Sequence, residues 1–317
     1  MQLPADLEIA RQLPPPNATV AEAQRYTRWL ATHHYENFNV VSWLLPRRLH
    51  QHFYNVYAYC RWADDLADEV SDPRQALELL DWWEEQLRNC YLGRASHTVF
   101  IALRPTIVEC DIPVEPFSDL LKAFRQDQTV HRYADWKAVL DYCTYSANPV
   151  GRLVLYLCGH RDEERQLLSD STCTALQLAN FWQDVNRDLD KDRIYIPLDR
   201  MKAHGVTEDF LFKRKFAPRY AGLMKDLVER TRPLFLRGLP LAEMVEPELR
   251  IDLELFSRGG LAVLDAIERI GYNTLEKRPA ISRSAQVRLL GRALLSRMFM
   301  PWLSGGDENA GVARRNV

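Results

Sequence analysis

Two pairs of aspartates at helical spacing are the residues of this sequence best suited to do chemistry. Asp64 and Asp68 form the first pair, and Asp184 and Asp188 form the second. Residues four positions apart lie on one face of a helix, so each pair predicts two carboxylates side by side. Such like-charged pairs destabilise an isolated helix by about 0.2–0.5 kcal/mol each. They therefore predict a compensating cation, and Mg²⁺, usually held by one or two carboxylates plus substrate phosphate, suits them best.

Polar residues precede each pair on the same helical face. Tyr57 and Arg61 complete the first stripe, and Gln177 and Asn180 complete the second. Because most neighbouring residues are apolar, the stripes predict the lining of a cavity rather than a solvated face. If the two helices face each other, four carboxylates surround one space, as in metal sites of helical bundles. The alternative is that the aspartates are solvated and that Asp64 pairs with Arg61.

This pattern indicates magnesium-assisted chemistry on a diphosphate, whose departure leaves a carbocation. Further donors are expected at the mouth of the site: Arg61, Lys191, Arg193 and Tyr195. For the two residues at 191 and 193, the alternative is an ordinary basic helix end. A carbocation needs a dry, aromatic cavity. The aromatic candidates are Phe38, Tyr57, Tyr142, Tyr145, Phe181 and Trp182, each of which alternatively packs in the core.

The composition is that of an ordinary globular protein, with 47% apolar and 26% charged residues in 317. The formal net charge of −2 argues against a nucleic-acid partner, which would favour a basic excess. No apolar stretch approaches the roughly 20 residues that span a bilayer, and no signal peptide is expected. Six scattered cysteines without a C-x-x-C predict reduced core thiols in a cytoplasmic protein.

Helical periodicity dominates the sequence, and alternating strand patterns are nearly absent. We therefore predict a single all-α domain over 19–303, preceded by a flexible leader (1–18) and followed by a disordered tail (304–317). The predicted helices are 19–33, 46–70, 72–93, 96–110, 114–130, 135–159, 163–190, 199–213, 218–237, 240–272 and 284–299.

Three motifs, taken in order, resemble those of the squalene/phytoene synthases, the head-to-head prenyl transferases. They are Tyr57-x3-Arg61-x2-Asp64-x3-Asp68, Gln177-x2-Asn180-x3-Asp184-x3-Asp188 and Arg193-Ile194-Tyr195-Ile196-Pro197. The resemblance covers about residues 20–300 and implies an all-α, single-domain isoprenoid synthase fold, with helices around a central catalytic cavity. It also implies Mg²⁺ ions held by Asp64, Asp68, Asp184 and Asp188, with Asn180 assisting.

Residue patterns and resemblance together define the expected site. The expected catalytic residues are Tyr57, Arg61, Asp64, Asp68, Asp184 and Asp188. The expected substrate-binding residues are Phe38, Tyr142, Tyr145, Asn148, Gln177, Asn180, Gln183, Arg193 and Tyr195.

Within this family the sequence is most similar to a bacterial branch, the hydroxysqualene synthases. The similarity is carried by residues 34–38 and 44–48, by 145–151 and by 180–185. This branch ionises presqualene diphosphate and captures the rearranged cation with water. The resemblance therefore implies presqualene diphosphate as substrate and a place in squalene and hopanoid synthesis. It also implies a presqualene diphosphate synthase and a hydroxysqualene reductase as partner enzymes.

Two departures from the wider family concern the cavity. Many members carry arginine where this chain has Gln183, so we expect one of two diphosphate subsites to be lost. Pro149 removes a helical N–H and frees the carbonyl of Tyr145. We expect this carbonyl and the Asn148 side chain to orient the attacking water. The alternative is a plain helix kink in which Asn148 is bonded internally.

Several other interpretations remain open. The same fold also suits a presqualene diphosphate synthase or a squalene- or phytoene-type synthase, which use two prenyl diphosphates. The sequence lacks a Rossmann glycine fingerprint, but squalene synthases bind NADPH without one. A different class is a helical scaffold whose acidic motifs are vestigial. Residues 289–303 mix apolar and basic side chains and predict peripheral membrane contact, with a packed terminal helix as the alternative.

Overall fold

The computed structural model describes residue 13 and residues 18–33 and 46–280, and these form the all-α fold that the periodicity predicts. Within those ranges, the only β-type pairing is an isolated bridge between Arg132 and Ile194. The helices are α1 (Val20–His33), α3 (Arg47–Asp68), α4 (Pro73–Tyr91), α5 (Thr98–Cys110), α6 (Glu115–Asp127), α7 (Trp136–Ser146), α8 (Asn148–Leu157), α9 (Glu163–Asp190), α10 (Leu198–Ala203), α11 (Glu208–Phe212), α12 (Pro218–Gly238), the 3₁₀ helix η2 (Leu239–Glu243) and α13 (Pro247–Arg269).

Local capping chemistry explains where several helices begin. Asp72 accepts a hydrogen bond from the backbone of α4, whose first residue is Pro73. Asp135 and Asp162 cap α7 and α9 in the same way. A capping carboxylate satisfies a backbone N–H that the helix leaves unpaired, and proline suits the first helical turn.

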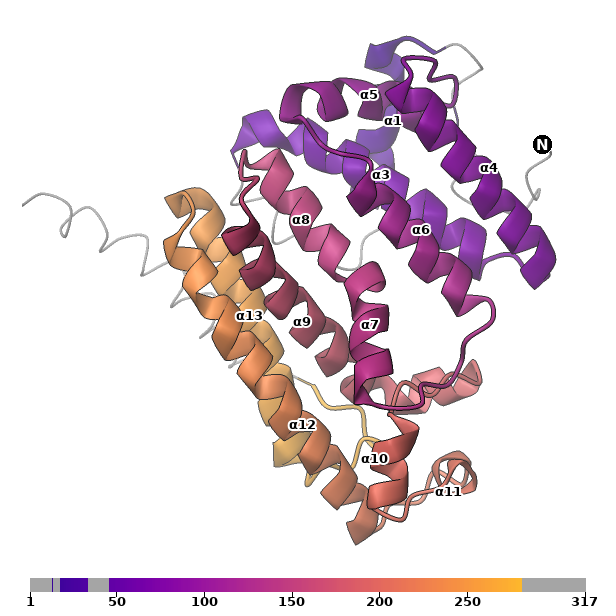
Figure 1. Ribbon diagram of the computed structural model, residues 1–317, viewed down its shortest axis with the longest axis vertical. Coiled ribbons are helices and arrows are strands. Elements are labelled where there is room, and N and C mark those ends of the chain that lie inside the picture. Colours follow the sequence, from indigo (N-terminus) through magenta and orange to yellow (C-terminus); the bar gives the residue numbers. More distant parts are fainter. Residues whose placement is uncertain (1–12, 14–17, 34–45, 281–317) are drawn as a thin grey trace, which may run out of the picture.

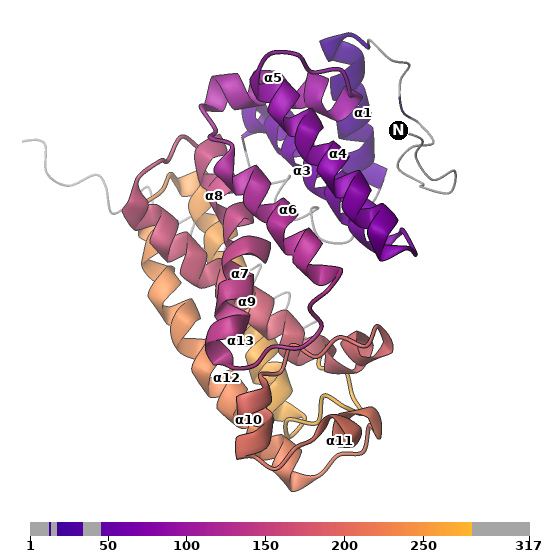
Figure 2. The same cartoon turned by 45° about the vertical axis from the view of Figure 1, so that its right-hand side comes forward.

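The helices pack around two clusters of buried apolar side chains. The first cluster joins α1 and α3–α6 with parts of α8 and α13, and it includes the stacked Trp62 and Trp83. The second joins α7 and α9–α13 and includes Trp182 and Phe235. Figures 1 and 2 show α1 and α3–α5 toward one end of the molecule and α12 and α13 toward the other. The first aspartate motif therefore lies on α3 of one cluster, and the second on α9 of the other.

Three predicted helices are divided in the structure. The helix predicted over 135–159 breaks at Ala147 (φ −121°, ψ −48°) into α7 and α8, just before the Asn148-Pro149 pair. The segment 199–213 forms α10 and α11, separated by Gly205 at φ +64°. The segment 240–272 forms η2 and α13. Proline near each new start explains two of these divisions, because it cannot donate an intrahelical hydrogen bond.

A close approach at Gly260 lets α13 pack against α12 and α9. A Cβ at this position would lie 2.2 Å from the Phe235 ring and 3.0 Å from the Leu176 side chain. Only glycine fits this helix crossing without displacing the aromatic ring.

Some predictions fall on residues that the structure does not describe. Phe38, the helix at 284–299, the basic and apolar segment 289–303, the tail and nearly all of the leader lie outside the described residues. Among the described helices, none combines the length and apolar character that crossing a membrane requires. All six cysteines are free of disulfides, and three of them are buried.

Candidate active site

The first motif is organised around Arg61 on α3. Its guanidinium contacts Asp65 at 2.6 Å and Asp64 at 3.7 Å. Asp65 is buried, and burial raises its pKa to about 6 despite Arg61. Burial and the neighbouring Asp68 carboxylate also raise the pKa of Asp64. Sequence reasoning offered the Arg61–Asp64 pair only as an alternative, and it gave no role to Asp65, which is one residue outside the expected stripe.

Two cations from the end of α9 reach the first motif. Lys191 Nζ lies 3.1 Å from one Asp68 oxygen, and Arg193 Nη2 lies 3.3 Å from the other. Although burial acts in the opposite direction, these cations lower the pKa of Asp68. The structure therefore brings Lys191 and Arg193 to the aspartates, as the sequence suggested.

The second motif lies on a kinked part of α9. Asp184 has non-helical dihedrals (φ −107°, ψ 16°), so its pair with Asp188 departs from ideal helical spacing. Burial, reinforced by the Asp184 charge, raises the pKa of Asp188 to about 7. The Arg278 guanidinium forms a two-pronged contact with Asp184, with N···O distances of 2.6 and 3.1 Å. Arg278 lies 94 residues from Asp184, and sequence reasoning gave it no role.

Gln183 anchors the segment that carries Arg278. Its side-chain amide donates a hydrogen bond of 2.8 Å to the carbonyl of Pro279. Gln183 thus contacts the backbone beside Arg278. We infer that Gln183 helps hold Arg278 against Asp184.

Within the described residues the four aspartates lie as two carboxylate pairs and not as one metal-binding cluster. Across these ranges, no three His, Cys, Asp or Glu side chains gather closely enough to hold a metal ion alone. Burial, reinforced in each pair by the neighbouring carboxylate, raises the pKa values of Asp64 and Asp188. Carboxylate pairs of this kind suit Mg²⁺ that takes its other ligands from phosphate and water.

An aromatic group adjoins the charged residues. The rings of Phe181 and Tyr195 stack with centroids 3.7 Å apart, and Tyr142 lies next to both. The Tyr142 hydroxyl donates to Asp127 at 3.0 Å. Burial raises the pKa of Asp127 to about 6. Sequence reasoning missed Asp127, because this acidic residue ends α6 without a helical partner.

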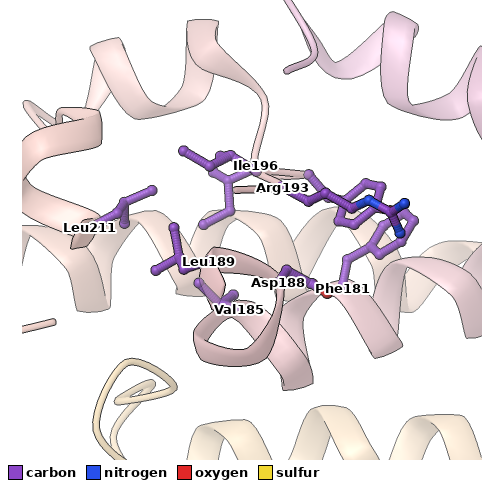
Figure 3. Close-up of a pocket in the computed structure, with 9 residues that line it drawn as sticks. Phe181, Val185, Asp188, Leu189, Arg193, Ile196 and Leu211 are labelled. Carbon is purple, nitrogen blue, oxygen red and sulfur yellow. The ribbon is translucent and has the colours of Figure 1, made fainter. Parts of the chain in front are cut away.

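Aromatic and charged residues that the sequence predicted for the site line one pocket. It is lined by Phe181, Val185, Asp188, Leu189, Arg193, Ile194, Tyr195, Ile196 and Leu211. Figure 3 shows Phe181, Asp188 and Leu189 coming from one helix toward the segment that carries Arg193 and Ile196, with Leu211 at the far side. The bridge to Arg132 holds this segment, and Ile194 donates its backbone N–H to His131 at 2.9 Å.

Several predicted site residues have other surroundings. Trp182 is fully buried and donates its indole N–H to Thr231 at 2.8 Å, which confirms the alternative of core packing. The Tyr145 ring lies under Lys122, at 5.3 Å. Asn148 accepts a hydrogen bond of 2.8 Å from Thr174, which is the internal contact that the kink interpretation expected.

The remaining members of the two stripes are accessible to different degrees. Asn180 is exposed, Gln177 is partly buried, and Tyr57 is partly buried with a pKa that burial raises. The contacts that we expect these residues to make with substrate or metal stay predictions.

Comparison with known proteins gives a consistent result. The family model described as squalene/phytoene synthase matches residues 31–285. Hydroxysqualene synthase of Rhodopseudomonas palustris is 37% identical, covering 71% of this chain and 76% of its own length. Phytoene synthase of Thermus thermophilus is 30% identical, covering 84% of this chain and 91% of its own.

A solved structure agrees with these relatives. The crystal structure of squalene synthase HpnC from Alicyclobacillus acidocaldarius has a TM-score of 0.78 and 45% sequence identity. The match covers 80% of this chain and 96% of that one. Because the family model matches residues 31–285 and these relatives are at least 30% identical over most of their length, the chain belongs to the squalene/phytoene synthase family.

Proposed function

We propose that this protein is a hydroxysqualene synthase, which converts presqualene diphosphate and water to hydroxysqualene and diphosphate. The observation that carries the proposal is Gln183, the neutral residue before Asp184. Its amide is bonded to the Pro279 carbonyl, so it adds no cation for a second diphosphate. An enzyme that starts from one diphosphate needs only one such subsite. Similarity to a protein named hydroxysqualene synthase supports the same reading.

Mg²⁺ would be held by Asp64, Asp68, Asp184 and Asp188, with Asn180 assisting. When bound, it neutralises charge that develops on the leaving diphosphate. Arg193 and Arg278 supply charge-assisted donors, and arginine presents a planar fork that matches phosphate oxygens.

The aromatic side of the pocket protects the cation. Phe181 and Tyr195 line the pocket, where they would exclude water and present π faces to positive charge, and Tyr142 lies behind them next to both rings. The contact between Asp127 and the Tyr142 hydroxyl fixes the orientation of that ring. Tyr57 and Arg61 extend the polar side of the site along α3.

Capture of the cation requires one positioned water in an otherwise dry cavity. We retain the Tyr145 carbonyl and Asn148 as the proposed water-binding groups, although Thr174 already donates to the Asn148 oxygen. Replacing Asn148 with alanine is expected to shift product from the alcohol toward elimination products. An unchanged product ratio would leave the Asn148 side chain with the structural role that its bond to Thr174 suggests.

The primary test is a product assay with purified protein, Mg²⁺ and no NADPH. Presqualene diphosphate and farnesyl diphosphate are supplied separately, and extracts are read by mass spectrometry. We expect hydroxysqualene from the first substrate and no consumption of the second. Consumption of farnesyl diphosphate would instead assign the protein to the synthases that join two prenyl diphosphates.

That second candidate function has one specific observation in its favour. The similarity to a phytoene synthase extends over 84% of this chain. A presqualene diphosphate synthase, squalene synthase or phytoene-type synthase would consume two prenyl diphosphates, which the same assay detects.

Under the primary proposal, the protein acts in the cytoplasm, at times on the membrane surface. A presqualene diphosphate synthase would supply its substrate, and a hydroxysqualene reductase would convert its product for hopanoid synthesis.

A further inference from the structure

The connection between α11 and α12 exposes aromatic and basic side chains together. Phe212 is 42% exposed and Phe216 is 37% exposed, and Lys213 and Lys215 between them are also exposed. We call residues 212–216 the basic tip. Large apolar side chains in such positions are stable in water only at a cost, and clusters of them often mark a binding surface.

Charge is strongly one-sided around the tip. Residues 210–225 contain five Lys and Arg and no Asp or Glu, in a chain with a formal net charge of −2. Arg214 pairs with Asp190. Within the part of the chain that the structure describes, neither Lys213 nor Lys215 has an ion-pair partner. The tip therefore presents uncompensated positive charge beside its aromatic rings.

The tip is held in place rather than frayed. Arg214 adopts the left-handed conformation (φ 50°), and its ion pair fixes it to the end of α9. The backbone N–H of Phe216 donates to Glu276 at 3.0 Å. The Arg219 guanidinium lies 4.4 Å from the centre of the buried Phe210 ring. These contacts fix the backbone that displays both exposed phenylalanines.

The tip lies beside the candidate active site. Leu211, which immediately precedes Phe212, lines the same pocket as Asp188 and Arg193. Figures 1 and 2 place α11 at the lower end of the molecule, at its outer edge beside α10. A surface bound to the tip would therefore lie near that pocket.

We propose that the basic tip docks the protein on anionic lipid membranes. Phenylalanine side chains enter the boundary between headgroups and acyl chains, and lysines stay near lipid phosphates. A protein partner fits less well, because lysine is depleted from protein–protein interfaces. The benefit to a long apolar substrate rests on the proposed function, but membrane binding itself does not.

Vesicle co-sedimentation of the full chain tests the proposal without any substrate. The two vesicle types are pure phosphatidylcholine and an equal mixture of phosphatidylcholine and phosphatidylglycerol. We expect binding to the mixed vesicles only, weakened by salt because the attraction is screened. Failure of the unaltered protein to bind them would overturn the proposal, whatever the outcome of the product assay.

Paired variants locate the binding surface. Lys213→Glu with Lys215→Glu, and separately Phe212→Ser with Phe216→Ser, are each expected to reduce vesicle binding by about tenfold or more. The matched control is Leu92→Ser with Arg94→Glu, since Leu92 is 60% exposed and Arg94 is an exposed basic residue in another loop. Equal losses in tip and control variants, or undiminished binding in the tip variants, would contradict the assignment. Circular dichroism confirms that every variant is folded.

Discussion

The two aspartate motifs have the same spacing but different surroundings. On α3, the first aspartate of the pair (Asp64) has a raised pKa, and the second (Asp68) is held by Lys191 and Arg193. On α9 the order is reversed, because Asp184 is held by Arg278 while Asp188 has a pKa near 7. Each motif thus has one aspartate in direct contact with cations from elsewhere in the chain and one whose pKa burial raises despite cations nearby.

This difference teaches that sequence symmetry does not set the electrostatics of the pair. The cations come from segments remote in sequence, and the kink at Asp184 alters the geometry of only the second motif. The first motif depends on the end of α9, and the second depends on the segment after α13. Under the proposed function, each motif would still offer a carboxylate pair to a divalent cation.

The largest expected effect is a loss of catalytic rate, and we expect it to be equal for the two motifs. Replacing Asp68 or Asp184 with asparagine should lower the rate of diphosphate release by about 10²–10³-fold, because each change removes a carboxylate that would hold the Mg²⁺ needed to neutralise the leaving group. Removing Mg²⁺ with a chelator should abolish release. The exposed Asp141, which pairs with Lys137, is the control, and its asparagine variant should retain activity. Full activity in one motif variant would show that the motifs are not equivalent.

A smaller effect separates the cations that serve the two motifs. Arg193→Ala and Arg278→Ala should each raise the KM for the diphosphate substrate by about 10- to 100-fold, through loss of charge-assisted hydrogen bonds. Arg278→Lys should recover only part of this loss, because lysine lacks the planar fork. Steady-state kinetics distinguish KM from kcat. An unchanged KM in Arg278→Ala would mean that this arginine only neutralises Asp184.

Gln183 provides a finer test of the second motif. Gln183→Ala should raise KM about fivefold, because a neutral hydrogen bond contributes about 1 kcal/mol and this free energy corresponds to about a fivefold change. If Gln183 acts by holding Arg278, the double variant Gln183→Ala/Arg278→Ala should be no worse than Arg278→Ala alone. Fully additive effects would instead indicate that Gln183 contacts substrate independently.

The sequence predicted local structure better than long-range contacts. Periodicity located α3 and α9, and helical spacing identified both aspartate pairs. Spacing carries no information about Arg278, whose contact with Asp184 forms only after α13 brings the chain back across the fold. Asp127 could not be predicted from the sequence pattern either, because its place in the site depends on its hydrogen bond with the Tyr142 hydroxyl and not on a repeated spacing.

The division at Ala147 shows a second limit. Pro149 signalled a disturbance of the predicted helix, but not whether it would kink or end there. Pro149 lies in the first turn of α8, where proline is favoured because this turn requires no intrahelical N–H donor. The choice depends on the packing of α8 against α9, where Asn148 bonds to Thr174. Such packing cannot be read from one segment alone.

The smallest expected effect has opposite signs in the two motifs and concerns stability of the metal-free protein. Burial and Asp184 raise the pKa of Asp188 from 3.8 to about 7, so its ionisation destabilises the folded state as pH rises between these values. For Asp68, burial is outweighed by Arg193 and Lys191, and the pKa falls below 3.8. Its ionised form therefore stabilises the fold above pH 3.8, and this contribution is lost as pH falls through the lowered pKa.

Asparagine at each position turns this difference into a measurement. At pH 8 with chelator, Asp188→Asn should raise the free energy of unfolding and Asp68→Asn should lower it, each by about 1 kcal/mol. The gain from Asp188→Asn should shrink as pH falls from 7 toward 4, whereas the loss from Asp68→Asn should persist to pH 4. Urea unfolding at pH 8, 6 and 4 measures both, with Asp141→Asn as the control. Changes of the same sign would contradict the view that cations from remote segments divide each pair into one stabilised and one destabilised carboxylate.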